Sequence, residues 1–291
     1  MNHRACNWLI GLTALIFTTA SLLAQQSLSV DVRMVEVYVS VFDGKGNRVQ
    51  HLQKDDFELV EEGVRQKVDV FESQAAGMDL ALLIDTSGSM MLQLPHVKNA
   101  VADLLTLLGP DDKVGLFSFM NRLTALQPLT RDRSSVLSVL LNTRPTGQTA
   151  LYDSLAQLAR DLSKSGGKKV ILMFTDGSDN ASVLTIESAV ANVRRIGVPV
   201  YAVAQGETLR NREVFKKLQE ISQSTNGVAF ESRKPDDLRE IFTRIGRDIQ
   251  HLYLLGYYPA NADGKADWRR IGVRLPRHPE FKVRAKEGYW K

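Results

Sequence analysis

The sequence predicts an α/β protein built on a doubly wound, mostly parallel sheet, with a smaller β-module beside it. Two continuous apolar runs, residues 80–84 and 170–174, are typical of strands buried on both faces. Segments with helical periodicity separate such runs, and apolar-polar alternation is confined to the two ends of the chain. Strands that alternate with helices indicate a parallel sheet covered on both faces.

The composition favours a globular protein without a nucleic-acid partner. The 291 residues are enough for one large domain, or for a medium domain with a small one. The hydrophobic share is 44% and the charged share 24%, which excludes a disordered or fibrous chain. The net charge is +4, and the basic residues are scattered among nearly as many acids.

Residues 1–24 have the form of a secretory signal peptide. Arg4 precedes an apolar run over residues 8–23, and the small residues Ala20 and Ala24 offer cleavage sites. The run is short for a membrane span and has no charged flank, so we expect an exported mature chain without a membrane span. The periplasm and the extracellular space are both open, and a retained N-terminal anchor is the alternative. Cys6, the single cysteine, lies inside the signal, so no disulfide is expected in the mature chain.

The N-terminal part, residues 28–75, is expected to form the first half of a β-module. Apolar and polar residues alternate over 30–41 and 68–71, with a turn cluster at 43–47. Short strands separated by turns favour antiparallel pairing.

The middle part, residues 79–250, is expected to be the α/β domain. Strands are predicted at 80–84, 114–119, 170–174, 198–203 and 228–230, and helices at 94–108, 134–141, 150–162, 186–196, 214–222 and 238–249. The strand signal of the ends returns in residues 251–291, at 253–258, 271–275 and 281–284. We therefore expect this tail to pack with the N-terminal strands, which makes the α/β domain an insertion in the β-module.

A loop rich in oxygen side chains follows the first buried strand. Asp85, Ser87 and Ser89 occupy alternate positions, and Gly88 lets the loop turn tightly between the serines. In doubly wound sheets, binding sites form outside the carboxyl ends of the strands. A carboxylate and two hydroxyls are hard ligands, which suit Mg²⁺, with Mn²⁺ or Ca²⁺ as alternatives.

Two later residues supply more oxygen at the same edge of the sheet. Asp176 directly follows the second continuously apolar strand, and Thr149 directly precedes a predicted helix. Because both positions are strand ends or helix starts, one fold can bring them to the first loop.

These three segments resemble the von Willebrand factor A-type domain and its metal-ion-dependent adhesion site. The resemblance covers roughly residues 79–250 and implies a non-enzymatic domain that binds a protein partner through a divalent metal. It implies that Ser87 and Ser89 coordinate the metal directly and that Asp85 and Asp176 act largely through water. Thr149 would be direct or water-bridged, and one coordination position would accept an Asp or Glu of the partner.

The flanking segments are similar to those of bacterial exported proteins with this domain. The similar segments are residues 41–43, 52–57, 61–63, 253–259 and 288–289. Gln148 departs from the family pattern, which often has glycine there, and we expect it to narrow the approach to Thr149.

Several alternatives stay open at this point. Ser87 and Ser89 can cap the following helix, and Asp85 can bond to turn amides, instead of binding metal. Asp153 is interpreted as a helix-surface or capping residue, and Asp179 and Asn180 as loop residues, with a supporting role at the metal as the lesser alternative. The alternative functions are a structural or assembly scaffold with a non-exchanging metal and a metal-assisted hydrolase. No His or Glu base stands near the motif in sequence, which disfavours the hydrolase.

Overall fold

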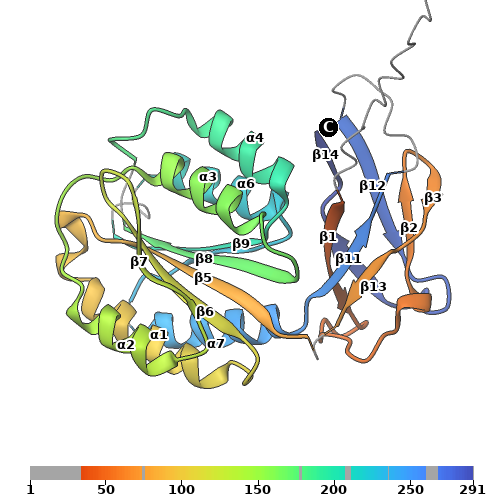
Figure 1. Ribbon diagram of the computed structural model, residues 1–291, viewed down its shortest axis with the longest axis horizontal. Helices are drawn as coiled ribbons and strands as arrows, with labels where there is room; N and C mark the ends of the chain where they lie inside the picture. The colour runs from red at the N-terminus through yellow and green to blue at the C-terminus, as the bar shows by residue number, and fades with distance from the viewer. Residues whose placement is uncertain are drawn as a thin grey trace, which may run out of the picture. The chain divides into compact units, whose positions relative to one another are not determined.

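The computed structural model describes residues 34–73, 76–176, 179–206, 211–234, 236–259 and 268–290 (Figure 1). The expected signal peptide and the expected strand residues Val30 and Val32 lie outside these ranges. Within the described ranges, no helix combines the length and apolar character that a membrane crossing requires.

The central sheet has six strands in the order β10-β9-β8-β5-β6-β7. Five of them are parallel, and they carry the apolar runs that the sequence predicts. The strands are β5 (Met78–Asp85), β6 (Lys113–Phe119), β7 (Leu123–Thr130), β8 (Lys168–Thr175), β9 (Val200–Ala204) and β10 (Ala229–Glu231).

Strand β7 is antiparallel to β6 and was not predicted from the sequence. Its apolar residues Leu123, Leu126 and Leu129 recur every third position, so they do not show the alternation of a strand. Pro128 lies within it, as edge strands allow, and two register shifts interrupt its pairing with β6.

Six described helices cover the two faces of this sheet, which confirms the doubly wound α/β fold (Figure 1). One face is covered by α1 (Leu94–Leu107), α2 (Arg133–Asn142) and α7 (Asp237–Gln250), and the other by α3 (Leu151–Leu162), α4 (Ile186–Ile196) and α6 (Arg212–Ser224). Helix α4 ends at Gly197, whose φ of 82° is the left-handed conformation that glycine adopts at a helix C-terminus.

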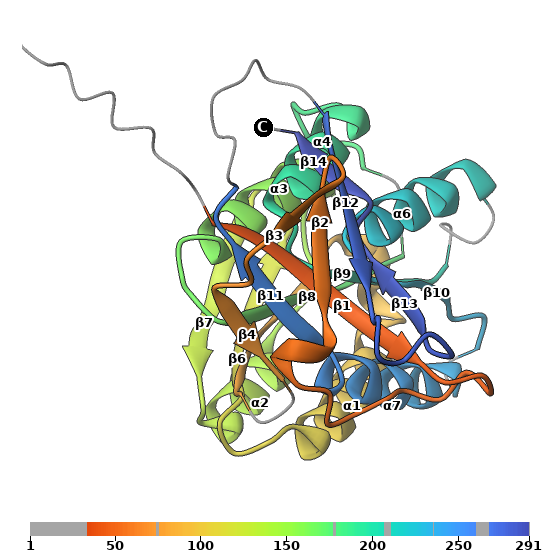
Figure 2. The same ribbon diagram turned by 90° about the vertical axis from the view of Figure 1, so that its right-hand side faces the viewer.

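The remaining strands form two four-stranded sheets, ordered β13-β1-β11-β4 and β14-β12-β2-β3. β1 pairs antiparallel with β11 and β13, so strands from both ends of the chain alternate in one sheet (Figure 2). Together with the short 3-10 turn η1 (Lys54–Asp56), we call these strands the β-module. They are β1 (Val35–Phe42), β2 (Glu58–Glu61), β3 (Val64–Gln66), β4 (Val70–Glu72), β11 (Tyr253–Tyr257), β12 (Trp268–Arg274), β13 (Lys282–Ala285) and β14 (Gly288–Trp290). That the α/β domain is an insertion in this module stays a prediction.

Strand β1 contributes to two cores through its alternating faces. Val37 and Val39 belong to the apolar core of the β-module. Tyr38, by contrast, belongs to the core on the face of the central sheet that α1, α2 and α7 cover. The Tyr38 hydroxyl accepts a hydrogen bond of 2.9 Å from the backbone amide of Lys169 on β8. The Lys169 side chain is 0% exposed, and its Nζ donates to Glu36 Oε1 at 2.8 Å and to the Ser165 carbonyl at 2.6 Å.

We expect Glu36→Ala to lower the free energy of unfolding by about 3 kcal/mol. The substitution leaves the buried Lys169 ammonium without its carboxylate, and the Ser165 carbonyl is the acceptor that remains. Urea unfolding followed by circular dichroism measures the loss. The double variant Glu36→Gln with Lys169→Met removes both charges and should recover most of it, and a Glu36→Ala protein as stable as the wild type contradicts the prediction.

Candidate metal centre

The loop after β5 brings its polar side chains to one point through short hydrogen bonds. The amide of Ser87 donates to Asp85 Oδ1 at 2.8 Å, and the hydroxyls of Ser87 and Ser89 are 3.0 Å apart. Ser89 Oγ then donates to Asp176 Oδ1 at 2.8 Å, across 87 positions of sequence. Four of the five residues that the sequence singles out are therefore linked directly.

Asp85 is fully buried, and both of its carboxylate oxygens are engaged. Oδ1 accepts from the Ser87 amide, and Oδ2 accepts from the Thr175 hydroxyl at 2.8 Å. Burial raises the pKa of Asp85 above its usual range, and the hydrogen bonds from Ser87 and Thr175 act in the opposite direction. Thr175 stands directly before Asp176, but no pattern in the sequence predicts its role.

Thr149 reaches the same edge through backbone contacts of its loop. The amide of Thr146 donates to the Thr86 carbonyl at 2.6 Å, and the amide of Gly88 donates to the Gly147 carbonyl at 3.3 Å. Thr149 itself is buried, and its amide donates to Asn180 Oδ1 at 2.8 Å.

Asn180 has a clearer structural role than a loop residue. The backbone amide of Asn180 in turn donates a hydrogen bond of 2.9 Å to the Thr149 carbonyl, so two hydrogen bonds link these residues. Gln148, beside Thr149, is exposed, and its backbone amide donates to Asn121 Oδ1 at 3.1 Å.

Two further carboxylates hold the segment after Asp176 against the start of α3. Asp153 accepts from the amides of Val183 and Leu184, at 2.8 and 2.9 Å. Asp179 Oδ2 accepts from the amide of Tyr152 at 2.9 Å. Both carboxylates are used for backbone capping, as expected for Asp153, and they fix the loops around Thr149 rather than adding ligands.

Gly206, after β9, lies against Asp176, and no pattern in the sequence predicts this contact either. Its φ is 59°, and a Cβ added there would stand 3.2 Å from both the Cβ and the carbonyl oxygen of Asp176. Glycine therefore permits the close approach of this loop to the end of β8.

The donor set fits a hard divalent cation. The contacts Ser87–Ser89 and Ser89–Asp176 join three oxygen side chains, and Asp85 joins them through the Ser87 amide. Carboxylates and hydroxyls are ligands that suit such a cation. In the part of the chain that the structure describes, no group of three or more His, Cys, Asp or Glu side chains offers a different metal site.

The doubly wound sheet and the oxygen-rich loops at its carboxyl edge define a class of α/β protein whose binding sites lie outside the carboxyl ends of the strands. Residues 79–244, more than half of the chain, match the family model of the von Willebrand factor type A domain. The chain therefore belongs to the von Willebrand factor type A domain family, as its motifs suggested. Domains of this family bind proteins, so the chain carries a protein-interaction domain.

The relatives are distant. A "UPF0353 protein" of Mycolicibacterium paratuberculosis is 25% identical over an alignment of 222 residues. The match covers 66% of this chain and 64% of that relative, so it spans less than two thirds of the relative's length. An aerotolerance-related membrane protein from Bacteroides fragilis has a similar structure, with a TM-score of 0.50 and 21% identity over 60% of this chain and 98% of the other. Proximal thread matrix protein 1 from the mussel byssus, solved with a zinc-occupied MIDAS motif, gives a TM-score of 0.51 and 21% identity over 65% of this chain and 49% of that one. At these identities the two structures establish the fold alone.

We expect Gly206→Ala to lower the free energy of unfolding by about 1–2 kcal/mol, because it combines a left-handed backbone with a close contact to Asp176. Thermal or urea unfolding measures the change. Gly272→Ala is the matched control, because a Cβ on Gly272 meets nothing within 4 Å. Equal stability of the two variants contradicts the prediction.

Proposed function

We propose that this chain is an exported adhesion protein that engages a protein partner through a divalent metal. The ligands would be Asp85, Ser87, Ser89, Thr149 and Asp176, and the preferred ion Mg²⁺, with Mn²⁺ or Ca²⁺ as alternatives. The observation that supports this most strongly is the chain of hydrogen bonds from Ser87 through Ser89 to Asp176. A bound cation would replace these contacts with bonds to itself.

The charge balance of the donor set favours binding of an acidic partner. Asp85 and Asp176 are the two carboxylates of the set, and the hydroxyl ligands are neutral. Both oxygens of Asp85 already accept protein hydrogen bonds, which suits a role through water. The metal would thus keep a strong attraction for an external carboxylate, supplied by an Asp or Glu of the partner.

The residues around the candidate ligands do not favour catalysis. The segments 85–90, 146–150 and 174–178 contain neither His nor Glu, so the sequence offers no general base of these types beside the ligands. A metal-assisted hydrolase would need such a group near the metal.

Exposed apolar side chains lie in the loops that carry the candidate ligands. Met91 is 66% exposed and Leu92 is 78% exposed; they stand two and three positions after Ser89, in the turn η2 (Gly88–Met91) and its cap. Val183, in the loop that Asp153 holds, is 92% exposed. Apolar side chains that face solvent next to a binding site suit contact with another protein.

Export is proposed from the signal-like residues 1–24, with the periplasm or the extracellular space as the destination and a retained anchor as the alternative. The Bacteroides fragilis relative is named as a membrane protein, which is compatible with an envelope location. Because the mussel protein was solved with zinc in its MIDAS motif, metal titrations should include Zn²⁺.

We expect Ser87→Ala and Asp176→Ala to abolish Mg²⁺-dependent capture of a partner without unfolding the domain, because each removes one oxygen of the donor set. The mature wild-type protein and both variants are used as bait in an envelope extract, with Mg²⁺ and with EDTA. Ser138→Ala, at an exposed position of α2, is the matched control and should behave as the wild type.

Capture that is equal with metal, with EDTA and with both variants contradicts the proposed mechanism. The remaining possibility is a structural metal that does not exchange, and titration calorimetry with Mg²⁺ tests it. A metal that stays bound through dialysis against EDTA, with capture indifferent to it, identifies the site as a structural one in an assembly scaffold.

The double variant Met91→Ser with Leu92→Ser should weaken partner capture about tenfold, because two exposed apolar contacts are lost, and should leave the Mg²⁺ affinity unchanged. The two readouts are the amount of partner captured from the envelope extract and the Mg²⁺ affinity measured by isothermal titration. Unchanged capture removes these side chains from the contact surface.

A further inference from the structure

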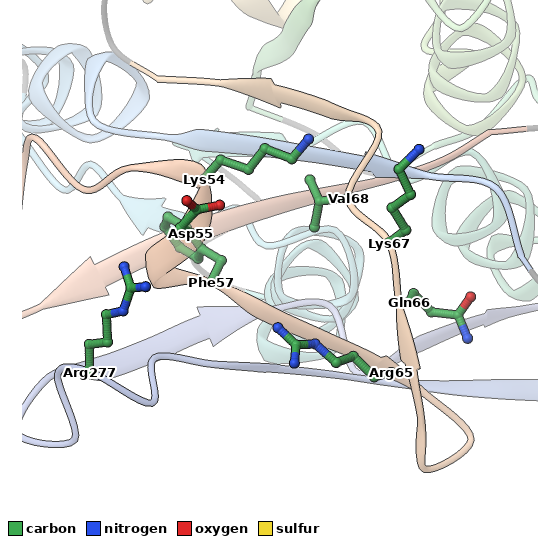
Figure 3. Close-up of a pocket in the computed structure, with 8 residues that line it drawn as sticks. All are labelled: Lys54, Asp55, Phe57, Arg65, Gln66, Lys67, Val68 and Arg277. Carbon is green, nitrogen blue, oxygen red and sulfur yellow. The ribbon is translucent and has the colours of Figure 1, made fainter.

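The β-module contains a pocket of about 510 Å³ that the metal site does not use (Figure 3). It lies between the η1 turn, the segment that joins β3 to β4, and the loop after β12. Its lining residues are Lys54, Asp55, Phe57, Arg65, Gln66, Lys67, Val68 and Arg277.

Positive charge dominates the lining, with four cationic side chains against the single carboxylate of Asp55. Arg277 pairs with Asp56 at 3.6 Å and Lys67 with Asp69 at 3.1 Å. Across the described part of the chain, Lys54 and Arg65 have no carboxylate within ion-pair distance. Two cations are therefore available to an external anion.

The floor of the pocket is apolar and buried. Phe57 and Val68 are each less than a tenth exposed, and the Phe57 ring packs on Phe71 and Tyr253 in the core of the β-module. A low-dielectric floor beneath unpaired cations strengthens their attraction for an anion. A guanidinium such as that of Arg65 binds a carboxylate in a bidentate manner.

The pocket adjoins the outer edge of strand β3. β3 is the last strand of the order β14-β12-β2-β3. It turns back from β2 through Glu62 and Gly63, whose φ values of 49° and 82° are those of a two-residue hairpin turn. The pair Glu61–Val64 closes this turn, so the next pair, Val60–Arg65, is the non-hydrogen-bonded one. The backbone N–H and C=O of Arg65 therefore point away from β2, to the outer edge.

We propose that this pocket and the β3 edge bind an extended acidic peptide segment of a partner protein. The peptide backbone would pair with Arg65 as an added strand, and its carboxylates would meet Lys54 and Arg65. An extended peptide satisfies both features at once, whereas a free anion would satisfy the charge alone. This interaction needs no metal, so it is independent of the adhesion mechanism proposed above.

The test uses the mature protein in EDTA and a fluorescein-labelled octapeptide in which glutamate alternates with threonine. Fluorescence anisotropy should show saturable binding that weakens as NaCl is raised. Lys54→Glu with Arg65→Glu should lower the affinity by about tenfold or more, because both available cations are reversed. These two residues are chosen because their replacement breaks no ion pair among the described residues.

Two controls isolate the charge and the edge. Arg131→Glu with Lys282→Glu makes the same charge change at exposed positions outside the pocket and should bind as the wild type. Peptides N-methylated on alternate residues, in either phase, keep their charge, and the phase that blocks strand pairing should lose most of the affinity.

Three results would overturn the proposal. The first is no saturable binding, in which case the cations serve only to keep the β3 edge from pairing with other chains. The second is equal binding by the pocket variant and its charge-matched control. The third is equal or tighter binding of a sulfated polysaccharide with no effect of N-methylation, which identifies a general polyanion surface. Because EDTA is present throughout, none of these results depends on the fate of the metal site.

Discussion

The parallel pairing of β5 with β8 is the constraint on which the candidate centre depends. Ile84 stands opposite Phe174 in this pairing, so the residues that follow, Asp85 and Asp176, leave the sheet at the same edge. Both strands are buried on their two faces, and a shift in register would move a whole apolar run out of its core. The hydrophobic pattern thus determines where two polar residues, 91 positions apart in the chain, can meet.

Around this constraint, the loops hold one another by both backbone and side-chain hydrogen bonds. Gly147 accepts from Gly88, and Asn180 and Thr149 exchange two hydrogen bonds. The hydroxyls of Ser87 and Ser89 contact each other, and Ser89 donates to Asp176, so a bound cation would replace these contacts with bonds to itself. Asp85 and Asp176 are the carboxylates of the donor set and its other members are neutral hydroxyls, so a bound ion would keep an attraction for the partner's acid.

The β-module and the α/β domain share β1, and this shapes both. One face of β1 completes the core of the module, and the other presents Tyr38 and Glu36 to β8. The buried Lys169 is tolerated only because it finds a carboxylate and a carbonyl in this interface. The module also carries an exposed edge at β3, bordered by cations, on which the peptide-binding proposal rests.

The sequence by itself determined the fold class, most of the strands and helices, and the five candidate ligands, because these depend on local periodicity and on a motif of fixed spacing. It did not predict β7, whose leucines follow no strand period, nor the roles of Thr175, Asn180 and Gly206. Those roles are contacts between segments far apart in the chain, and no local pattern encodes them. For the same reason only the tertiary structure could bring Lys54, Arg65 and Arg277 around one pocket, since they belong to three separate segments of the β-module.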